Sequence, residues 1–180
     1  MKTVSWLFCL FLVLSATGCA THQAVSQERD LQKQNALTLD LLSLHSAVKR
    51  ESALTVARTA IQFSRQQADR YRISGSPRYH NLLINLGLKE RGLCFHWTDD
   101  LLDKMQDIKS EQFYFHSAIA HRGSNLREHS SVVVTFKGES FETGIVLDGW
   151  RYSGDLYWSR VKEDSYAWQP RYPERASRER

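Results

Sequence analysis

The stretch "HSSVVVTFKGESFETGIVLDGW", residues 129–150, indicates the fold class of this protein most directly. Residues 129–136 are rich in β-branched side chains and end on an aromatic residue, which is typical of a strand. After the turn "KGES", residues 141–150 return to the same character. Two such runs separated by a short turn predict an antiparallel β-hairpin.

The turn length decides which residues of the hairpin face each other. If residues 138–139 form a two-residue type II′ turn, Val132 lies opposite Ile145 and His129 lies opposite Asp148. Facing residues have Cβ atoms roughly 4.5–5.5 Å apart, so the imidazole and the carboxylate can form a hydrogen bond. A bulge or a longer loop would change this register. An ion pair without a catalytic role at the end of a hairpin is the alternative interpretation.

Helical periodicity precedes the hairpin. Apolar residues recur at helical spacing from about Ala36 to Arg72, which predicts two helices with a break near residues 49–52. A shorter helix is expected over residues 78–88, after the loop "SGSP". Further strands are expected over residues 112–120 and 156–161.

A further helix is expected to begin near Cys94. Its apolar stripe continues at Trp97, Leu101, Met105 and Ile108, at spacings of three and four residues. Cys94 therefore lies on the buried side of the first turn, where unpaired N–H groups and the helix dipole favour a thiolate. The alternative is that Cys94 is a small apolar residue of the core.

The expected fold class is α+β, with N-terminal helices and the cysteine-bearing helix packed on an antiparallel sheet. The chain of 180 residues is long enough for a single domain with a core of its own. We expect this domain to cover residues 34–170, with a basic polar tail over residues 171–180.

The N-terminus has the layout of a bacterial secretory signal, expected over residues 1–18. A positively charged start precedes an apolar run over residues 6–14, which is too short to span a bilayer. The segment "ATGC", residues 16–19, resembles a lipobox, after which the signal is cut and Cys19 is acylated. The next position holds Ala20 rather than Asp, which resembles the pattern of lipoproteins sorted to the outer membrane. An ordinary signal peptide with an incidental cysteine is the alternative.

A protein anchored by lipid in the outer membrane and facing the periplasm is therefore expected, with a polar tether over residues 19–33. Cys9 leaves with the signal, so Cys94 remains unpaired. Such a cysteine in an exported protein is a bridge between chains, a buried inert thiol or a reactive nucleophile. Without Lys2, 23 of the 24 Lys and Arg residues remain against 20 Asp and Glu residues. This small surplus does not indicate a nucleic-acid partner.

Cys94, His129 and Asp148 have the side chains of a nucleophile, a base and an orienting residue. His129 would take the thiol proton, and Asp148 would fix the imidazole tautomer. The backbone N–H of Cys94, at a helix N-terminus, would help to hold an oxyanion. The side-chain candidates for the same oxyanion site are Asn81, Asn85 and Gln112.

Three segments resemble motif blocks of the transglutaminase-like branch of the papain-like cysteine peptidase superfamily. They are "GLCFHWTDDLL" (92–102), "EHSSVVV" (128–134) and "GIVLDGW" (144–150). The resemblance implies a cysteine helix packed on an antiparallel sheet, and a thioester mechanism at peptide, isopeptide or amide bonds without a cofactor. It also implies that the three residues named above are catalytic. The block after the histidine departs from the family pattern, with Ser130-Ser131 where a small residue and an aromatic are usual. A peptide, a protein or a peptidoglycan stem would suit as substrate.

The histidines invite a metal interpretation as well. His96 lies two residues from Cys94, and His116 and His121 are five apart. Zinc sites usually have more closely spaced ligand pairs, and no second cysteine is available, so no metal is expected. His116 is expected to be a sheet residue, and His80 to lie on a helix surface or a half-buried face.

Trp97 and Trp150 are close in sequence to the proposed site and are candidates for the walls of a substrate cleft, with core packing as the alternative. The aromatic residues of the C-terminal segment, 152–168, either cover the sheet or line a substrate groove. The competing function is a catalytically inactive lipoprotein that serves as a binding or assembly module on the same fold.

Overall fold

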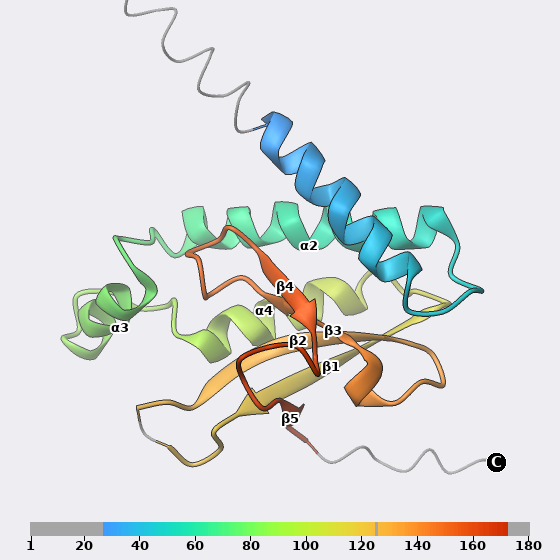
Figure 1. The fold of residues 1–180 in the computed structure, drawn as a ribbon. Helices are drawn as coiled ribbons and strands as arrows, with labels where there is room; N and C mark the ends of the chain where they lie inside the picture. Colours follow the sequence, from blue (N-terminus) through green and yellow to red (C-terminus); the bar gives the residue numbers. More distant parts are fainter. Residues whose placement is uncertain (1–26, 125, 173–180) are drawn as a thin grey trace, which may run out of the picture.

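The computed structural model of the protein describes residues 27–124 and 126–172. In this part of the chain, helices pack on a five-stranded antiparallel sheet, so the predicted α+β class is confirmed (Figure 1). The helices are residues 27–42, α2 (Arg50–Arg70), α3 (Pro77–Asn85), α4 (Cys94–Gln106) and the 3-10 helix η1 (Phe141–Thr143). The strands are β1 (Phe113–Ala120), β2 (His129–Phe136), β3 (Ile145–Asp148), β4 (Tyr157–Arg160) and β5 (Gln169–Pro170).

The sheet has the strand order β4-β3-β2-β1-β5, and every neighbouring pair is antiparallel. β1 and β2 pair along their whole length, from Phe113 opposite Phe136 to Ala120 opposite His129. β2 is the central strand, and almost all of its residues are buried because both faces of the sheet are covered. The very short β5, which the sequence did not predict, adds to the free edge of β1.

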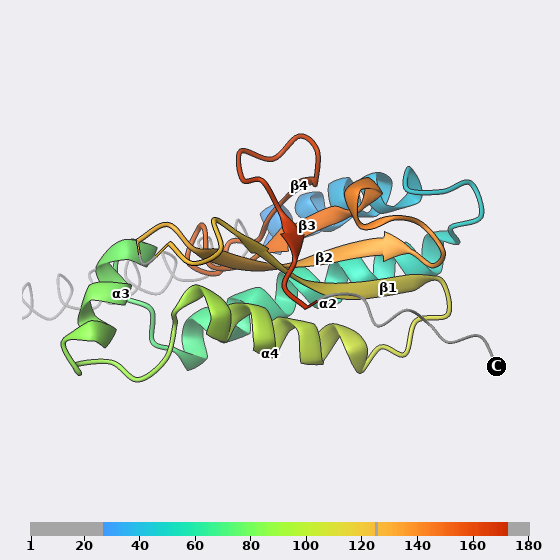
Figure 2. The same cartoon turned by 90° about the horizontal axis from the view of Figure 1, so that it is seen from below.

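The main core lies between the sheet and the helices. The strands contribute Val132, Val134, Ile145 and Leu147, all at most 1% exposed. The buried face of α2, which packs against α4, includes the small side chains of Ala53, Ala57 and Ala60 beside larger ones. Helix α3 lies apart from this core, at the left end of the molecule in both views (Figures 1 and 2).

The second face of the sheet is covered by η1 and by the C-terminal segment. Val133 and Val146 on this face pack with Phe141, Val161 and Trp168. The aromatic residues of this segment therefore cover the sheet in part, which was one of the two alternatives left open by the sequence.

The predicted register of the hairpin is wrong by two residues. Val132 lies opposite Leu147 instead of Ile145, because the connection contains η1 and is longer than a two-residue turn. Continuing the observed register places Asp148 opposite Ser131. His129 and Asp148 are therefore diagonal neighbours. They still share one face of the sheet, since a shift by an even number of residues keeps every side chain on its face.

The boundary between tether and domain also differs from the prediction. Residues 27–33, which the sequence placed in the tether, belong to the helix that ends at residue 42. They are anchored to the domain: Lys33 Nζ donates to Asp155 Oδ1 at 2.6 Å, and Arg65 Nε donates to Asp30 Oδ1 at 2.8 Å. At the other end, Arg171 of the predicted tail donates to Asp99 Oδ1 at 2.8 Å.

The predicted signal (residues 1–18), Cys9 and the predicted acylation site Cys19 lie outside the described residues. Among the helices that the structure does describe, none is both long enough and apolar enough to cross a bilayer.

Candidate active site

Cys94 is the first residue of α4, as predicted, and is half-buried. The apolar residues that follow it at helical spacing, Trp97, Leu101 and Met105, are at most 2% exposed and hold the helix against the sheet. At the first helical position the backbone N–H has no acceptor within the helix, so the N–H of Cys94 is available to a ligand. The Sγ atom lies 4.0 Å from the carbonyl oxygen of Glu128, the residue before His129.

The loop that leads into α4 is held by His80 of α3. This imidazole is fully buried, contrary to the predicted surface or half-buried position, and its Nε2 lies 2.9 Å from the carbonyl oxygen of Arg91. Gly92 passes directly over the ring with φ +128°, and a Cβ atom there would lie 2.5 Å from His80 Nε2. Only glycine permits this close approach, which fixes the direction in which the chain enters Cys94.

His96 closes the first turn of α4. Its Nδ1 accepts hydrogen bonds from the backbone N–H groups of Gly92 and Leu93, at 3.2 and 3.3 Å. Burial and the charge of Arg91 lower the pKa of His96, which keeps the ring neutral and Nδ1 free to accept. His96 thus has a structural partner of its own. Among the described residues, no three His, Cys, Asp or Glu side chains gather so that they could hold a metal ion.

His129 and Asp148 form a buried pair. Nε2 of His129 lies 2.7 Å from Oδ2 of Asp148, and the side chains are 3% and 1% exposed. The sequence predicted this contact from strands in direct opposition, whereas the structure makes it across a diagonal, which long side chains can span.

The other ring nitrogen of His129, Nδ1, is the one left for Cys94. It is buried and has no hydrogen-bond partner among the described groups. Burial alone would lower the pKa of His129, but its hydrogen bond to Asp148, the nearby Cys94 thiol and the charges of both groups raise it to about 9. A loose contact between nucleophile and base is common before substrate binds.

Three aromatic rings surround the imidazole of His129. The rings of Trp150, Tyr166 and Trp168 have centroids 4.8, 5.0 and 5.4 Å from it. Trp150 remains a candidate for a cleft wall because it is only half-buried. Trp97, the other candidate, is 2% exposed and packs edge-on against Tyr71, so it is a core residue.

Besides His129, Asp148 contacts Arg151, a residue that no sequence motif had indicated. The Arg151 backbone N–H donates to Oδ1 at 3.0 Å, and Nε donates to Oδ2 at 3.1 Å. Burial would raise the pKa of Asp148, but its hydrogen bond to His129 and the charges of His129 and Arg151 keep that pKa low. The Arg151 guanidinium also donates to both carboxylate oxygens of Asp164, at 3.2 and 3.0 Å. The spacing of three residues from Asp148 to Arg151 was visible in the sequence, but nothing marked Asp164.

The structure separates the three side-chain candidates for the oxyanion site. Gln112 bonds to the backbone of Ala47 and Lys49, between the first two helices, and Asn85 is exposed at the end of α3. Asn81 lies near the site, because its Oδ1 accepts from Trp150 Nε1 at 3.3 Å. That bond uses the amide oxygen and leaves the Nδ2 donors available.

Comparison of the chain with protein-family models, with curated proteins and with solved structures found no significant match. The resemblance to the transglutaminase-like branch therefore rests on the three motif segments of the sequence.

Proposed function

We propose that this protein is a thiol hydrolase or transferase that acts on peptide, isopeptide or amide bonds through a thioester on Cys94. The observation that carries the proposal is the buried 2.7 Å contact of His129 with Asp148, beside a half-buried cysteine at a helix N-terminus. A similar order and arrangement of residues in the transglutaminase-like branch supports the same chemistry.

The proposed reaction begins with attack of the Cys94 sulfur on the substrate carbonyl carbon. The developing oxyanion is stabilised by the Cys94 backbone N–H, and the side-chain candidate is Asn81, which bonds to Trp150 beside His129. The His129 imidazolium gives its proton to the leaving amine, the C–N bond breaks, and a thioester remains on Cys94. Water or a second amine then attacks the thioester, and His129 takes the proton of that nucleophile. The C–S bond breaks, the acyl product leaves, and the Cys94 thiolate and the His129 imidazolium are restored.

The electrostatics of the site favour an activated thiol over an inert one. A histidine with a pKa of about 9 is protonated at neutral pH, and an imidazolium next to a thiol stabilises the thiolate. Asp148 compensates the imidazolium charge, and its own pKa is held low, so the pair stays ionised through the neutral range.

The first test measures the reactivity of Cys94 across pH. The full-length protein is treated with iodoacetamide between pH 5 and 10, and alkylation is followed by mass spectrometry of the tryptic peptide 92–104, which contains Cys94. At pH 6 we expect wild-type Cys94 to react at least roughly tenfold faster than Cys94 in His129→Ala. The difference should shrink above about pH 9, where His129 loses its proton and no longer stabilises a thiolate.

The matched control is His116→Ala, which removes another buried imidazole, one bonded to Thr135 Oγ1 at 2.9 Å. This variant should keep the wild-type reactivity of Cys94. If the wild type and His129→Ala react equally slowly at pH 6, His129 does not activate the thiol, and the binding or assembly module becomes the better description.

We also propose that the domain is held at the outer membrane by lipid on Cys19, on the grounds of the lipobox-like segment and Ala20. Cys19→Ser is expected to leave unprocessed, unlipidated protein in the host cell, detected by the electrophoretic mobility of the precursor and by the absence of labelled fatty acid. Cys9→Ser, in the segment that is cut off, should mature normally. Normal maturation and unchanged membrane fractionation of Cys19→Ser would contradict the anchor.

A further inference from the structure

The loop after β3 brings a second buried charge against the site. The Arg151 side chain is 14% exposed and spans the gap between Asp148 and Asp164. It lies close to two aromatic rings, with its guanidinium carbon 3.9 Å from the Tyr157 centroid and 4.9 Å from the Tyr166 centroid. Such stacking removes the rotational freedom that usually makes an arginine contact weak.

Asp164 lies in the segment after β4, and its side chain is fully buried, at 0% exposure. Besides both bonds from Arg151, its Oδ1 accepts from the backbone N–H of Tyr166 at 3.0 Å. Tyr166 is one of the three rings around His129. One carboxylate therefore holds Arg151 and also fixes a wall of the site.

Four charged side chains contact one another in turn, and their charges alternate in sign. The His129 imidazolium faces Asp148, Asp148 faces Arg151, and Arg151 faces Asp164. Arg151 alone would add a cation next to the imidazolium and would compete with it for Oδ2 of Asp148. Because Asp164 neutralises Arg151, the pair supplies two N–H donors to Asp148 without adding net positive charge beside His129.

We propose that Arg151 and Asp164 are a positioning pair for the reactive site: Arg151 fixes the orientation of the Asp148 carboxylate toward His129, and Asp164 neutralises Arg151 so that the imidazolium is retained. Neither residue touches the reacting atoms. The inference rests on the proposed function, since it assigns these residues to the same thiol chemistry.

The test uses the alkylation of Cys94 in the full-length protein at pH 6, with four variants. Arg151→Gln and Asp164→Asn are each expected to slow alkylation roughly tenfold. The double variant is expected to react no more slowly than Arg151→Gln alone, because Asp164 acts through Arg151. Arg151→Lys keeps the charge but replaces the planar guanidinium, which bridges two carboxylates, with an ammonium group. Its alkylation rate should therefore lie between those of the wild type and Arg151→Gln.

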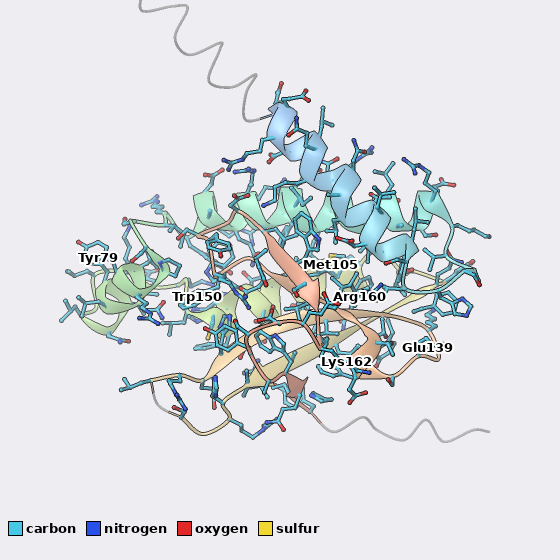
Figure 3. All side chains as sticks on the ribbon, viewed as in Figure 1. Tyr79, Met105, Glu139, Trp150, Arg160 and Lys162 are labelled. Atoms are coloured by element: carbon cyan, nitrogen blue, oxygen red, sulfur yellow. The ribbon has the colours of Figure 1, made fainter. Side chains whose placement is uncertain are left out.

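The control is Arg160→Gln, which removes a partly buried arginine at the end of β4. Arg160 bonds to Thr143 O at 3.1 Å and to Ser43. In the sheet it lies opposite Ile145, which is at the other end of β3 from Asp148. Figure 3 likewise shows Arg160 well separated from Trp150. We expect this variant to lower the melting temperature without changing the alkylation rate.

Failure of the positioning pair and failure of the proposed function give different results in this experiment. Equal rates for the wild type and His129→Ala in the same experiment would overturn the proposed function itself. A wild type that reacts faster than His129→Ala, together with Arg151→Gln and Asp164→Asn within twofold of the wild type, would overturn only the positioning pair. Single effects that multiply in the double variant would also overturn it, because the two residues would then act independently.

Discussion

Replacement of Cys94 by alanine is expected to abolish acyl transfer, with a loss of about a thousandfold or more. His129→Ala should come within about tenfold of the same loss, because nucleophile and base act as a unit and their effects do not add. The measurement is the release of p-nitrophenol from p-nitrophenyl acetate, a generic acyl donor, at pH 7. The acetyl group should be found on peptide 92–104 of the wild type and should be absent from that peptide in Cys94→Ala.

Two histidine variants make this result specific. His116→Ala controls for the loss of a buried imidazole, and His96→Ala controls for proximity to the thiol. His96→Ala removes the acceptor for two N–H groups at the start of α4, so we expect a loss of about 1 kcal/mol in stability but less than about tenfold in rate. A zinc site built on Cys94 and His96 predicts the reverse, with strong loss at His96 and inhibition by chelators. Equal and mild effects at Cys94 and His129 would leave only a binding or assembly role.

Asp148→Asn is expected to slow the same reaction by about 10²–10⁴-fold while the protein stays folded. The amide has nearly the shape of the carboxylate and can still bond to Nε2 of His129. It carries no charge, however, so it stabilises the imidazolium poorly, and its NH2 group can donate to Nε2 and select the tautomer with Nδ1 protonated toward Cys94. The pKa of His129 should fall from about 9, because the bond to Asp148 and its charge both raise that pKa.

The fall in the His129 pKa can be measured directly by NMR titration of the imidazole. The matched control is Asp155→Asn, which removes a carboxylate that bonds to Arg29 and Lys33 of the first helix, residues 27–42. That variant should lose some stability and keep its rate. A rate for Asp148→Asn within threefold of the wild type, with an unchanged His129 titration, would show that Asp148 has no role in orienting the base.

The pairing of His129 with Asp148 could be predicted from the sequence even though the register was wrong. Alternation along each strand assigns a side chain to a face, and an error of two residues leaves that assignment intact. The register itself depended on Phe141 of η1. This ring is 4% exposed and packs against the second face of the sheet. Burial of this ring in the folded protein outweighs the preference for a two-residue turn, and nothing local to the turn reveals it.

By itself, the sequence determined the longer helices and strands of this protein and the faces on which their side chains lie. Helical spacing placed Cys94 at the start of α4 on its buried side, and strand periodicity placed a histidine and an aspartate on one face of a hairpin. Only the tertiary structure decided what surrounds them. The contact of His80 with Gly92 and the ion pair of Arg151 with Asp164 join segments whose approach depends on how the loops cross the folded sheet, and no periodicity encodes a contact of that kind.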